Sequence, residues 1–478
     1  MVVQGTWGVQ ACRLRVYSPP MPSFDALVIG TGQAGPALAA RLSGAGMSVA
    51  VVERGKFGGT CVNDGCTPTK AMVASAYAAF IARRAGDYGV VTGGVRVDFG
   101  AVMARKDKIV AASNSGVEKW MAGLKGGKVY RGHARFVGPD ALEVGGEKLV
   151  AGKIFLNVGG RPLVPDMPGL NEVPFLTNQS MMGLQSLPEH LLVVGGSYIG
   201  LEFGQMMRRF GSNVTVIEMG PRLVAREDED VSAALQEMLQ AEGIDVRLDA
   251  KCLSVKKESD GVSVGLECTD GAPRARGTHL LLAVGRIPNT DDLGLDKAGV
   301  KLDSRGYIEV DKALQTSNSR VWALGDCNGK GAFTHTAYND YEIVADNLLH
   351  RAGRKWTDRV PVYALYTDPP LGRVGMNEAE AKQAGIATLV GKRPMTRVSR
   401  AVEKGETLGF LKVCVEASSG RILGASLLGV GADEAVHSLI DAVVAKTPVK
   451  EFQQRMRIHP TVSELLPTVM EGLKAAGQ

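Results

Sequence analysis

Cys61 and Cys66 carry the most distinctive chemistry that this sequence offers. Four residues separate them in the segment Gly58-Gly-Thr-Cys-Val-Asn-Asp-Gly-Cys-Thr-Pro-Thr-Lys70. Cysteines at this spacing can close a disulfide across a loop or one helical turn, and a nearby helix N-terminus would lower the pKa of a thiol. The alternatives are two buried, inert cysteines or half of a metal site. We expect no metal site, because no second Cys/His pair with ligand spacing is present.

An alanine-rich helix is expected directly after the pair, running to about Arg84. Thr67 is expected to cap this helix, and Pro68 suits its first position. Asp64, between the two cysteines, adds a negative charge, which should raise the pKa of a thiol or disfavour anionic substrates.

A repeated glycine pattern organises the chain around this segment. The residues 25–30 read as a buried strand, and Gly30, Gly32 and Gly35 then precede a helix and a strand that ends at Glu53. The pattern recurs 165 positions later, with a strand at 191–194, a helix, and a second strand at 214–217. The second copy has its glycines and carboxylate at Gly195, Gly196, Gly200 and Glu218. Two tight turns in an ordinary parallel sheet would not account for both carboxylates.

The repeat predicts two dinucleotide-binding units. Glycines allow the backbone to approach a pyrophosphate, the helix N-terminus supplies positive partial charge, and the carboxylate accepts hydrogen bonds from a ribose. In the second copy Ser197 replaces the usual second glycine, which could weaken the approach of a phosphate. Glu218 would repel a 2′-phosphate and accept a 2′-hydroxyl, so we expect NADH, with NADPH left possible by Arg222 and Arg226.

Composition excludes several classes of protein. The chain of 478 residues is long enough for about three domains. Its net charge of +5 is spread without basic runs, so no nucleic-acid surface is expected. No apolar run is long enough to cross a bilayer and no signal peptide is evident, which favours a cytoplasmic protein. Residues 1–22 lack periodicity and are expected to form a disordered extension.

Several separate motifs resemble one known family, the flavin-dependent pyridine nucleotide–disulfide oxidoreductases. The resemblance runs from about residue 24 to 470. It rests on Gly-Gly-Thr-Cys…Cys-x-Pro-x-Lys, Gly-Ser-Tyr198-Ile-Gly-Leu-Glu202, Val-Gly285-Arg, Ala-Leu-Gly-Asp326 and His459-Pro-Thr-Val-Ser-Glu464. The resemblance implies an α/β fold with two Rossmann-like domains and a C-terminal α+β dimerisation domain. The expected boundaries are 23–155 and 281–345 for the FAD domain, 156–280 for the NAD(P) domain and 346–478 for the dimerisation domain.

The resemblance also implies a role for each candidate residue. The first glycine unit would hold FAD, with Glu53 on its ribose and Asp326 on its ribityl or phosphate part, while Gly59, Thr60 and Ala134 are further candidate FAD contacts. The second unit would hold the nicotinamide dinucleotide, with Gly195, Gly200, Glu218 and Gly285 as candidate contacts and Tyr198 over the nicotinamide pocket. Cys66 would face the flavin and Cys61 would exchange with substrate. Lys70 would lie near the flavin and pair with Glu202.

Acid–base chemistry is expected at the C-terminus. Disulfide exchange needs a group that takes and returns a thiol proton, and an imidazole titrates in the useful range. His459 with Glu464 suits this role, and the resemblance implies that the pair reaches the flavin of a second subunit, so a homodimer is required. His335 resembles a flavin-proximal position, and a satisfied core histidine is an equal interpretation.

These observations predict an enzyme that passes electrons from NADH through FAD and the Cys61–Cys66 pair to a small disulfide or dithiol. A mercuric or other metal-ion reductase is the first alternative, although the chain lacks a C-terminal cysteine pair that would deliver metal ions. A flavin-binding redox sensor without turnover is a hypothesis from another class.

Overall fold

Strand β1 is the buried centre of the first sheet. In the computed structural model, which describes residues 22–267 and 273–476, Ala26, Leu27 and Val28 are fully buried. β1 is parallel to β2 and β6, as expected for strands that are covered on both faces. The order is β3-β2-β1-β6-β5-β4, with β16 beside β6. These strands are β1 Ser23–Ile29, β2 Val49–Glu53, β3 Gly127–Arg131, β4 Ala134–Phe136, β5 Ala141–Val144, β6 Glu147–Leu156 and β16 Val321–Ala323.

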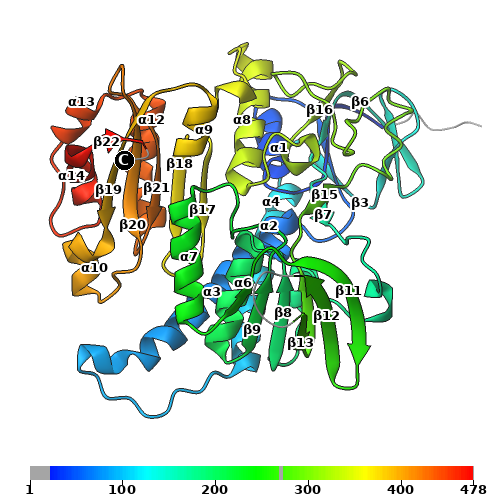
Figure 1. Ribbon diagram of the computed structural model, residues 1–478. Coiled ribbons are helices and arrows are strands. Elements are labelled where there is room, and N and C mark those ends of the chain that lie inside the picture. Colours follow the sequence, from blue (N-terminus) through cyan, green and yellow to red (C-terminus); the bar gives the residue numbers. More distant parts are fainter. Residues whose placement is uncertain (1–21, 268–272, 477–478) are drawn as a thin grey trace, which may run out of the picture.

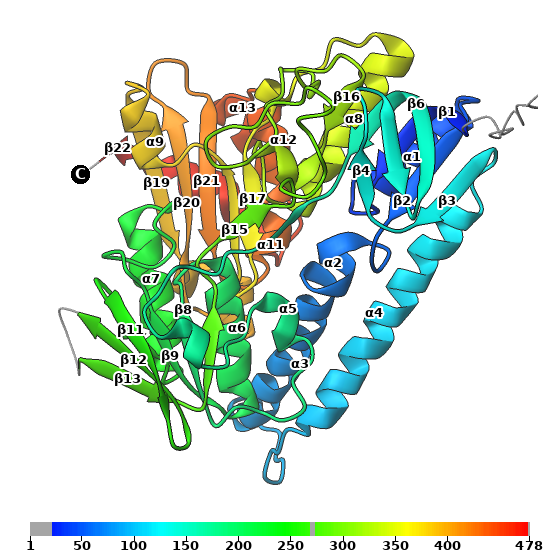
Figure 2. The same cartoon turned by 90° about the vertical axis from the view of Figure 1, so that its right-hand side faces the viewer.

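Helices from distant parts of the chain belong to this unit, some lying against the sheet and others extending away from it (Figures 1 and 2). They are α1 Gly35–Gly44, α2 Gly59–Asn63, α3 Cys66–Arg83, α4 Phe99–Ala122 and α8 Thr334–His350. The alanine-rich helix was predicted to begin after a Thr67 cap, and this was wrong. Gly65 occupies the N-cap position and Cys66 is the first helical residue. The cysteine thiol therefore lies in the first turn, where the helix dipole favours negative charge.

The second glycine unit forms its own parallel sheet in the order β10-β9-β8-β14. Its elements are β8 His190–Val194, β9 Asn213–Ile217, β10 Asp245–Arg247, β14 His279–Leu282, α5 Asn178–Met181, α6 Tyr198–Phe210 and α7 Glu229–Ala241. An antiparallel sheet lies beside it, with β11 Lys251–Glu258, β12 Gly261–Glu267 and β13 Arg274–Gly277. The short pair of β7 Gly160–Pro162 and β15 Arg286–Pro288 connects the two units.

The C-terminal region is an antiparallel sheet with short helices. Its order is β17-β18-β21-β20-β19-β22, and it packs over its own apolar core. The strands are β17 Val362–Leu365, β18 Leu371–Gly375, β19 Thr388–Pro394, β20 Phe410–Glu416, β21 Ile422–Leu428 and β22 Lys474–Ala475. The helices are α9 Glu378–Gln383, α10 Ser399–Glu403, α11 Ala432–Ala435, α12 His437–Val444, α13 Val449–Gln453 and α14 Leu466–Val469.

The first unit is built from two separate stretches of the chain. β16 follows the second glycine unit in the sequence but pairs with β6 of the first sheet, so the chain leaves the first unit and returns to it. The predicted fold class, α/β with two Rossmann-like units and a C-terminal α+β unit, is confirmed. Among the described residues, no helix is both long and apolar enough to span a membrane. The predicted extension at residues 1–22 lies almost wholly outside the described residues.

A buried charge cluster fixes helix α6 against the C-terminal region. Arg209 near the end of α6 pairs with Glu242 at 2.7 Å and with Asp368 at 2.5 Å. Gln205, one turn earlier, donates to the Asp368 carbonyl and accepts from its amide. Because an unpaired charge here would be costly, these contacts define where α6 lies. The same face of α6 carries Glu202 toward the cysteine pair.

Candidate active site

The two cysteines meet where the first turn of α3 faces α2. Cys61 lies in α2 and Cys66 begins α3, and both carry free thiols. The thiols lie close enough for each to shift the pKa of the other. The Cys66 Sγ also lies 3.2 Å from the Thr334 hydroxyl at the start of α8. Two adjacent thiols of this kind can be oxidised to a disulfide and reduced again.

The surroundings make the two thiols chemically unequal. The hydrogen bond from Cys61 lowers the pKa of Cys66 to about 6, and Thr334 and the charge of Lys70 add to this against the cost of burial. The same hydrogen bond, burial and the charge on Cys66 raise the pKa of Cys61. The reduced pair therefore holds its negative charge on Cys66 and its proton on Cys61. Asp64 is not among the causes of the pKa shift at either cysteine, so its expected effect on a thiol pKa or on anionic substrates stays a prediction.

Lys70 and Glu202 form an ion pair beside Cys66. The Lys70 Nζ lies 2.5 Å from Glu202 Oε2 and 4.5 Å from the centre of the Tyr366 ring. Glu202 is buried, and its other oxygen accepts a hydrogen bond from the Tyr366 amide at 3.0 Å. Lys70 follows Cys66 by one helical turn, so α3 places its ammonium group near the thiol. This pair joins α3, α6 and the loop after β17 at one point.

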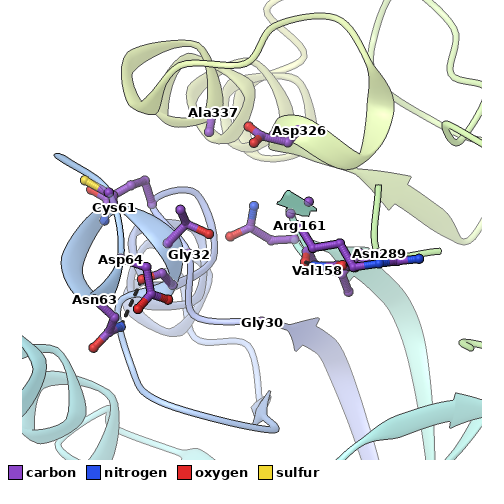
Figure 3. Close-up of a pocket in the computed structure, with 18 of the residues that line it drawn as sticks. Gly30, Gly32, Cys61, Asn63, Asp64, Val158, Arg161, Asn289, Asp326 and Ala337 are labelled. Carbon is purple, nitrogen blue, oxygen red and sulfur yellow. Dashed lines mark hydrogen bonds between the residues drawn. The ribbon is translucent and has the colours of Figure 1, made fainter. Parts of the chain in front are cut away.

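A cavity of about 640 Å³ extends from the cysteines past the first glycine loop (Figure 3). Many of the predicted site residues line it, although they are widely separated in sequence. They are Gly30, Gly32, Glu53, Gly59, Thr60, Cys61, Cys66, Lys70, Ala134, Tyr198, Glu202 and Asp326. Asp64 also lines the cavity, and burial raises the pKa of its carboxyl. The lining does not include the predicted residues Gly35, Gly195, Gly200, Glu218, Gly285, His459 and Glu464.

Hydrogen bonds at the two glycine loops repeat with the sequence. Glu53 accepts the Thr31 amide at 2.9 Å and the Gly55 amide at 2.8 Å. At positions 165 residues later, Glu218 accepts the Gly196 amide at 2.6 Å and the Gly220 amide at 2.8 Å. Each carboxylate thus closes its loop at the carboxyl edge of the sheet, where open α/β sheets bind their ligands.

The third glycine of each loop allows close packing. A Cβ on Gly35 would lie 2.2 Å from the Gly30 carbonyl oxygen, and one on Gly200 would lie 2.0 Å from that of Gly195. Any larger residue would push α1 or α6 away from its strand. These two glycines therefore act on the helix position, which explains why they do not line the cavity.

Asp326 faces the cavity from the opposite side to the cysteines (Figure 3). Burial raises the pKa of its carboxyl, and Arg286 Nε lies 3.7 Å away, beyond hydrogen-bonding distance. An acceptor in this setting is suited to a ligand hydroxyl group.

His459 and Glu464 lie together in the C-terminal region. His459 Nδ1 is 2.9 Å from Glu464 Oε2, and the imidazole is 74% exposed while the carboxylate is 12% exposed. The carboxylate orients the ring and leaves the other ring nitrogen free to act on a thiol. Neither residue lines the cavity of its own chain.

Comparison with known proteins decides the family. Residues 24–340 match the family described as pyridine nucleotide-disulphide oxidoreductase, and residues 362–470 match the dimerisation domain of that family. The chain is a pyridine nucleotide-disulphide oxidoreductase. The sequence-based resemblance is confirmed, and with it the class of enzyme, a flavoprotein that uses FAD and NAD(P)H to act on a disulfide.

Relatives of this oxidoreductase carry different names. The chain is 35% identical to a mercuric reductase of Streptomyces lividans, over 95% of its own length and 96% of the relative. It is also 35% identical to a dihydrolipoyl dehydrogenase of Thermus scotoductus, over 95% and 98%. The structure of the HOCl-induced flavoprotein disulfide reductase RclA from Escherichia coli is 33% identical with a TM-score of 0.86, covering 94% of this chain and 100% of that one.

The residues that line the cavity of this oxidoreductase fit FAD. Gly59 packs on Gly32 so closely that a Cβ there would lie 2.8 Å from the Gly32 Cα, which leaves a wall of backbone for a pyrophosphate. Asp326 offers an acceptor at the far side of the cavity. When bound, FAD supplies the transfer of an electron pair between a nicotinamide and a disulfide.

Sequence reasoning missed several residues of this oxidoreductase site. Asn157 at the end of β6 accepts the Gly35 amide and donates to the Leu324 carbonyl, and no motif signalled it. Arg286 lines the cavity and follows Gly285 directly in the Val-Gly-Arg motif. Thr334 contacts Cys66, whereas the sequence motif pointed to its neighbour His335. His335 binds the Val362 carbonyl at 2.7 Å, stacks on Phe333 and does not line the cavity.

Proposed function

We propose that this enzyme transfers electron pairs between NADH and a small disulfide or dithiol. The observation that carries the proposal is the pairing of two unequal thiols with a His459–Glu464 pair. Disulfide exchange needs one thiol that is deprotonated only when it attacks, a second sulfur that holds negative charge, and an acid–base group. Metal-ion reduction has no comparable need for a proton carrier.

The proposed half-reaction with a disulfide balances as follows. His459 of the partner subunit removes the proton from Cys61, whose sulfur attacks the substrate disulfide and forms a mixed disulfide. The leaving thiolate takes the proton from that imidazole. The Cys66 thiolate then attacks Cys61 and releases the second substrate thiolate. The substrate has gained two electrons and the enzyme holds a Cys61–Cys66 disulfide, which NADH reduces through the cofactor.

We assign the binding of the nicotinamide dinucleotide to the second glycine unit. Tyr198 stands at the start of α6 and lines the cavity, so it suits a cover over the nicotinamide pocket. Glu218 closes the second glycine loop, and its carboxylate would repel a 2′-phosphate bound there, which favours NADH. Arg222 supports this choice, since it pairs with Glu229 at 3.2 Å and donates to the Ala225 carbonyl.

A homodimer is part of the proposal. The exposed imidazole of His459 lies in the region that matches a dimerisation domain, and the cysteines belong to the cavity of the other units. Apolar neighbours of His459 are also exposed, with Met456 at 96% and Ile458 at 80%. A second copy would cover them and bring the imidazole to Cys61.

The decisive experiment measures NADH oxidation by purified enzyme with a panel of acceptors. The panel contains lipoamide, glutathione disulfide, neutral organic disulfides and Hg(II), each tested with NADH and NADPH. We expect turnover with a neutral disulfide and NADH, and loss of it in the Cys66→Ser variant, which should keep its flavin. If NADH were oxidised with Hg(II) but with none of the disulfides, the proposed class of substrate would be wrong.

Metal-ion reduction is the second candidate, because adjacent thiols are good ligands for soft metal ions and several relatives are named mercuric reductases. His459→Ala separates the two functions. It should abolish disulfide turnover but leave metal-ion reduction unchanged.

A further inference from the structure

Thr334 makes a side-chain hydrogen bond to Cys66 from outside the cysteine pair. Its hydroxyl lies 3.2 Å from the Cys66 sulfur, across 268 positions of sequence. Thr334 begins α8 as Cys66 begins α3, so the first turns of two helices converge on one sulfur. Both helix dipoles favour negative charge at this point.

The hydroxyl has a defined direction in the hydrogen bond. A thiolate has no proton to give, so when Cys66 is ionised the threonine must be the donor. Within the described residues the Cys66 sulfur is the hydrogen-bond partner of Thr334 Oγ1, which leaves the hydroxyl proton available for that sulfur. Consistent with this, the hydroxyl lowers the pKa of both thiols.

Aromatic packing holds Thr334 in place. The neighbouring Phe333 ring stacks on Tyr363 at 5.5 Å with an interplanar angle of 4°, and it lies 5.6 Å from the Tyr198 ring. The hydroxyl of Thr336 donates to the Phe333 carbonyl at 2.7 Å and accepts from its amide at 3.2 Å. The turn that carries Thr334 is therefore fixed from both sides, so the hydroxyl is positioned before the thiolate forms.

We propose that Thr334 is a further catalytic residue, whose hydroxyl donates a hydrogen bond to the Cys66 thiolate and keeps the negative charge of the reduced pair on that sulfur. This rests on the proposed electron relay. When the Cys61–Cys66 bond breaks, two electrons and one proton enter, the proton resides on Cys61, and Cys66 becomes the thiolate. Thr334 stabilises the thiolate on Cys66 through this hydrogen bond, while Cys61 keeps the proton and remains the sulfur that exchanges with substrate.

The test measures the ionisation of Cys66 in flavin-loaded enzyme that carries Cys61→Ser. The rate of alkylation of Cys66 by iodoacetamide is measured from pH 4 to 10. Mass spectrometry identifies the residue that is alkylated. Thr334→Val should raise the apparent pKa of Cys66 by about one to two pH units, since loss of a hydrogen bond to a charged group destabilises the charged form by an equivalent free energy. Thr334→Ser should restore the parent value. Thr334→Ala serves the same purpose as valine if the valine variant fails to fold.

Thr67→Val is the matched control, because Thr67 follows Cys66 directly and its hydroxyl makes no hydrogen bond to either thiol within the described residues. It should leave the pKa of Cys66 unchanged. The proposal is overturned if Thr334→Val and Thr334→Ala titrate like the parent, or if Thr67→Val shifts the pKa equally. Failure of the electron relay is seen separately, as wild-type enzyme that does not turn over any disulfide.

Discussion

Cys66 lies between a cation and an anion that pull its ionisation in opposite directions. The charge of Lys70 lowers the pKa of its thiol, and the charge of Glu202 raises it. Because Lys70 is itself bound to Glu202, its effect on the sulfur is partly offset, and neutral donors become important. The Cys61 thiol and the Thr334 hydroxyl supply them. Only one of the sulfurs can hold the charge, which is why their pKa values move apart.

This asymmetry predicts different pH profiles for the two cysteines. In Cys61→Ser, where the serine hydroxyl still provides a donor, alkylation of Cys66 should rise with pH, with its midpoint at about 6, and level off above about pH 7. An acid whose pKa is lowered in the folded protein is ionised above that value, so about nine-tenths of Cys66 should be thiolate at pH 7. Cys66→Ser is the matched variant, and alkylation of Cys61 should still be rising at pH 9. Equal profiles for the two variants would contradict the assignment.

At the scale of elements, each glycine loop depends on one close contact between helix and strand. Gly35→Ala would force α1 away from β1, and Gly200→Ala would force α6 away from β8. Each change should lower the free energy of unfolding by about 1–3 kcal/mol through overpacking. Gly35→Ala should lose flavin absorbance on purification, whereas Gly200→Ala should keep the flavin and bind NADH more weakly.

Controls for this pair exist within the same helices. A Cβ on Gly44 at the end of α1 would meet nothing within 4 Å, and one on Gly204 in α6 would make ordinary contacts at 3.5 Å. Both alanine variants should behave as wild type in flavin content and NADH binding. If Gly200→Ala lost flavin as readily as Gly35→Ala, the assignment of the two units to different cofactors would be wrong.

The same elements show what the sequence could and could not predict. Glycine spacing and carboxylates predicted both dinucleotide loops, because the contacts between each loop and its carboxylate are local and repeat at a fixed offset. The start of α3 was misplaced because propensity favoured Thr67 and Pro68, while the fold places Cys66 in the first turn. Contacts such as Thr334 with Cys66 join residues far apart in the chain, so no local pattern records them. The division into domains at 155 and 280 stays a prediction.

At the scale of the whole molecule, the proposed function requires that two chains share the active site. One chain holds the thiols, Lys70 and Glu202 around its cavity, but its own His459 and Glu464 do not line that cavity. The imidazole is exposed beside apolar side chains that a partner would cover. The proposed dimer would have an isologous interface, in which each subunit supplies His459 to its partner and receives the partner's His459 in return.

Mixed dimers test this sharing directly. Cys61→Ala and His459→Ala should each be inactive with disulfides as homodimers, because one lacks the attacking sulfur and the other the proton carrier. The two variants are coexpressed, and all dimers are recovered without separating mixed dimers from homodimers. Each mixed dimer should then contain one site with both groups intact. Random pairing makes half of the dimers mixed, so the unfractionated sample should show about a quarter of wild-type activity. Coexpression of Cys61→Ala with Cys66→Ala is the control, since both changes fall on the same side of the site and no intact site can form. Mixed dimers without activity would show that each chain completes its own site.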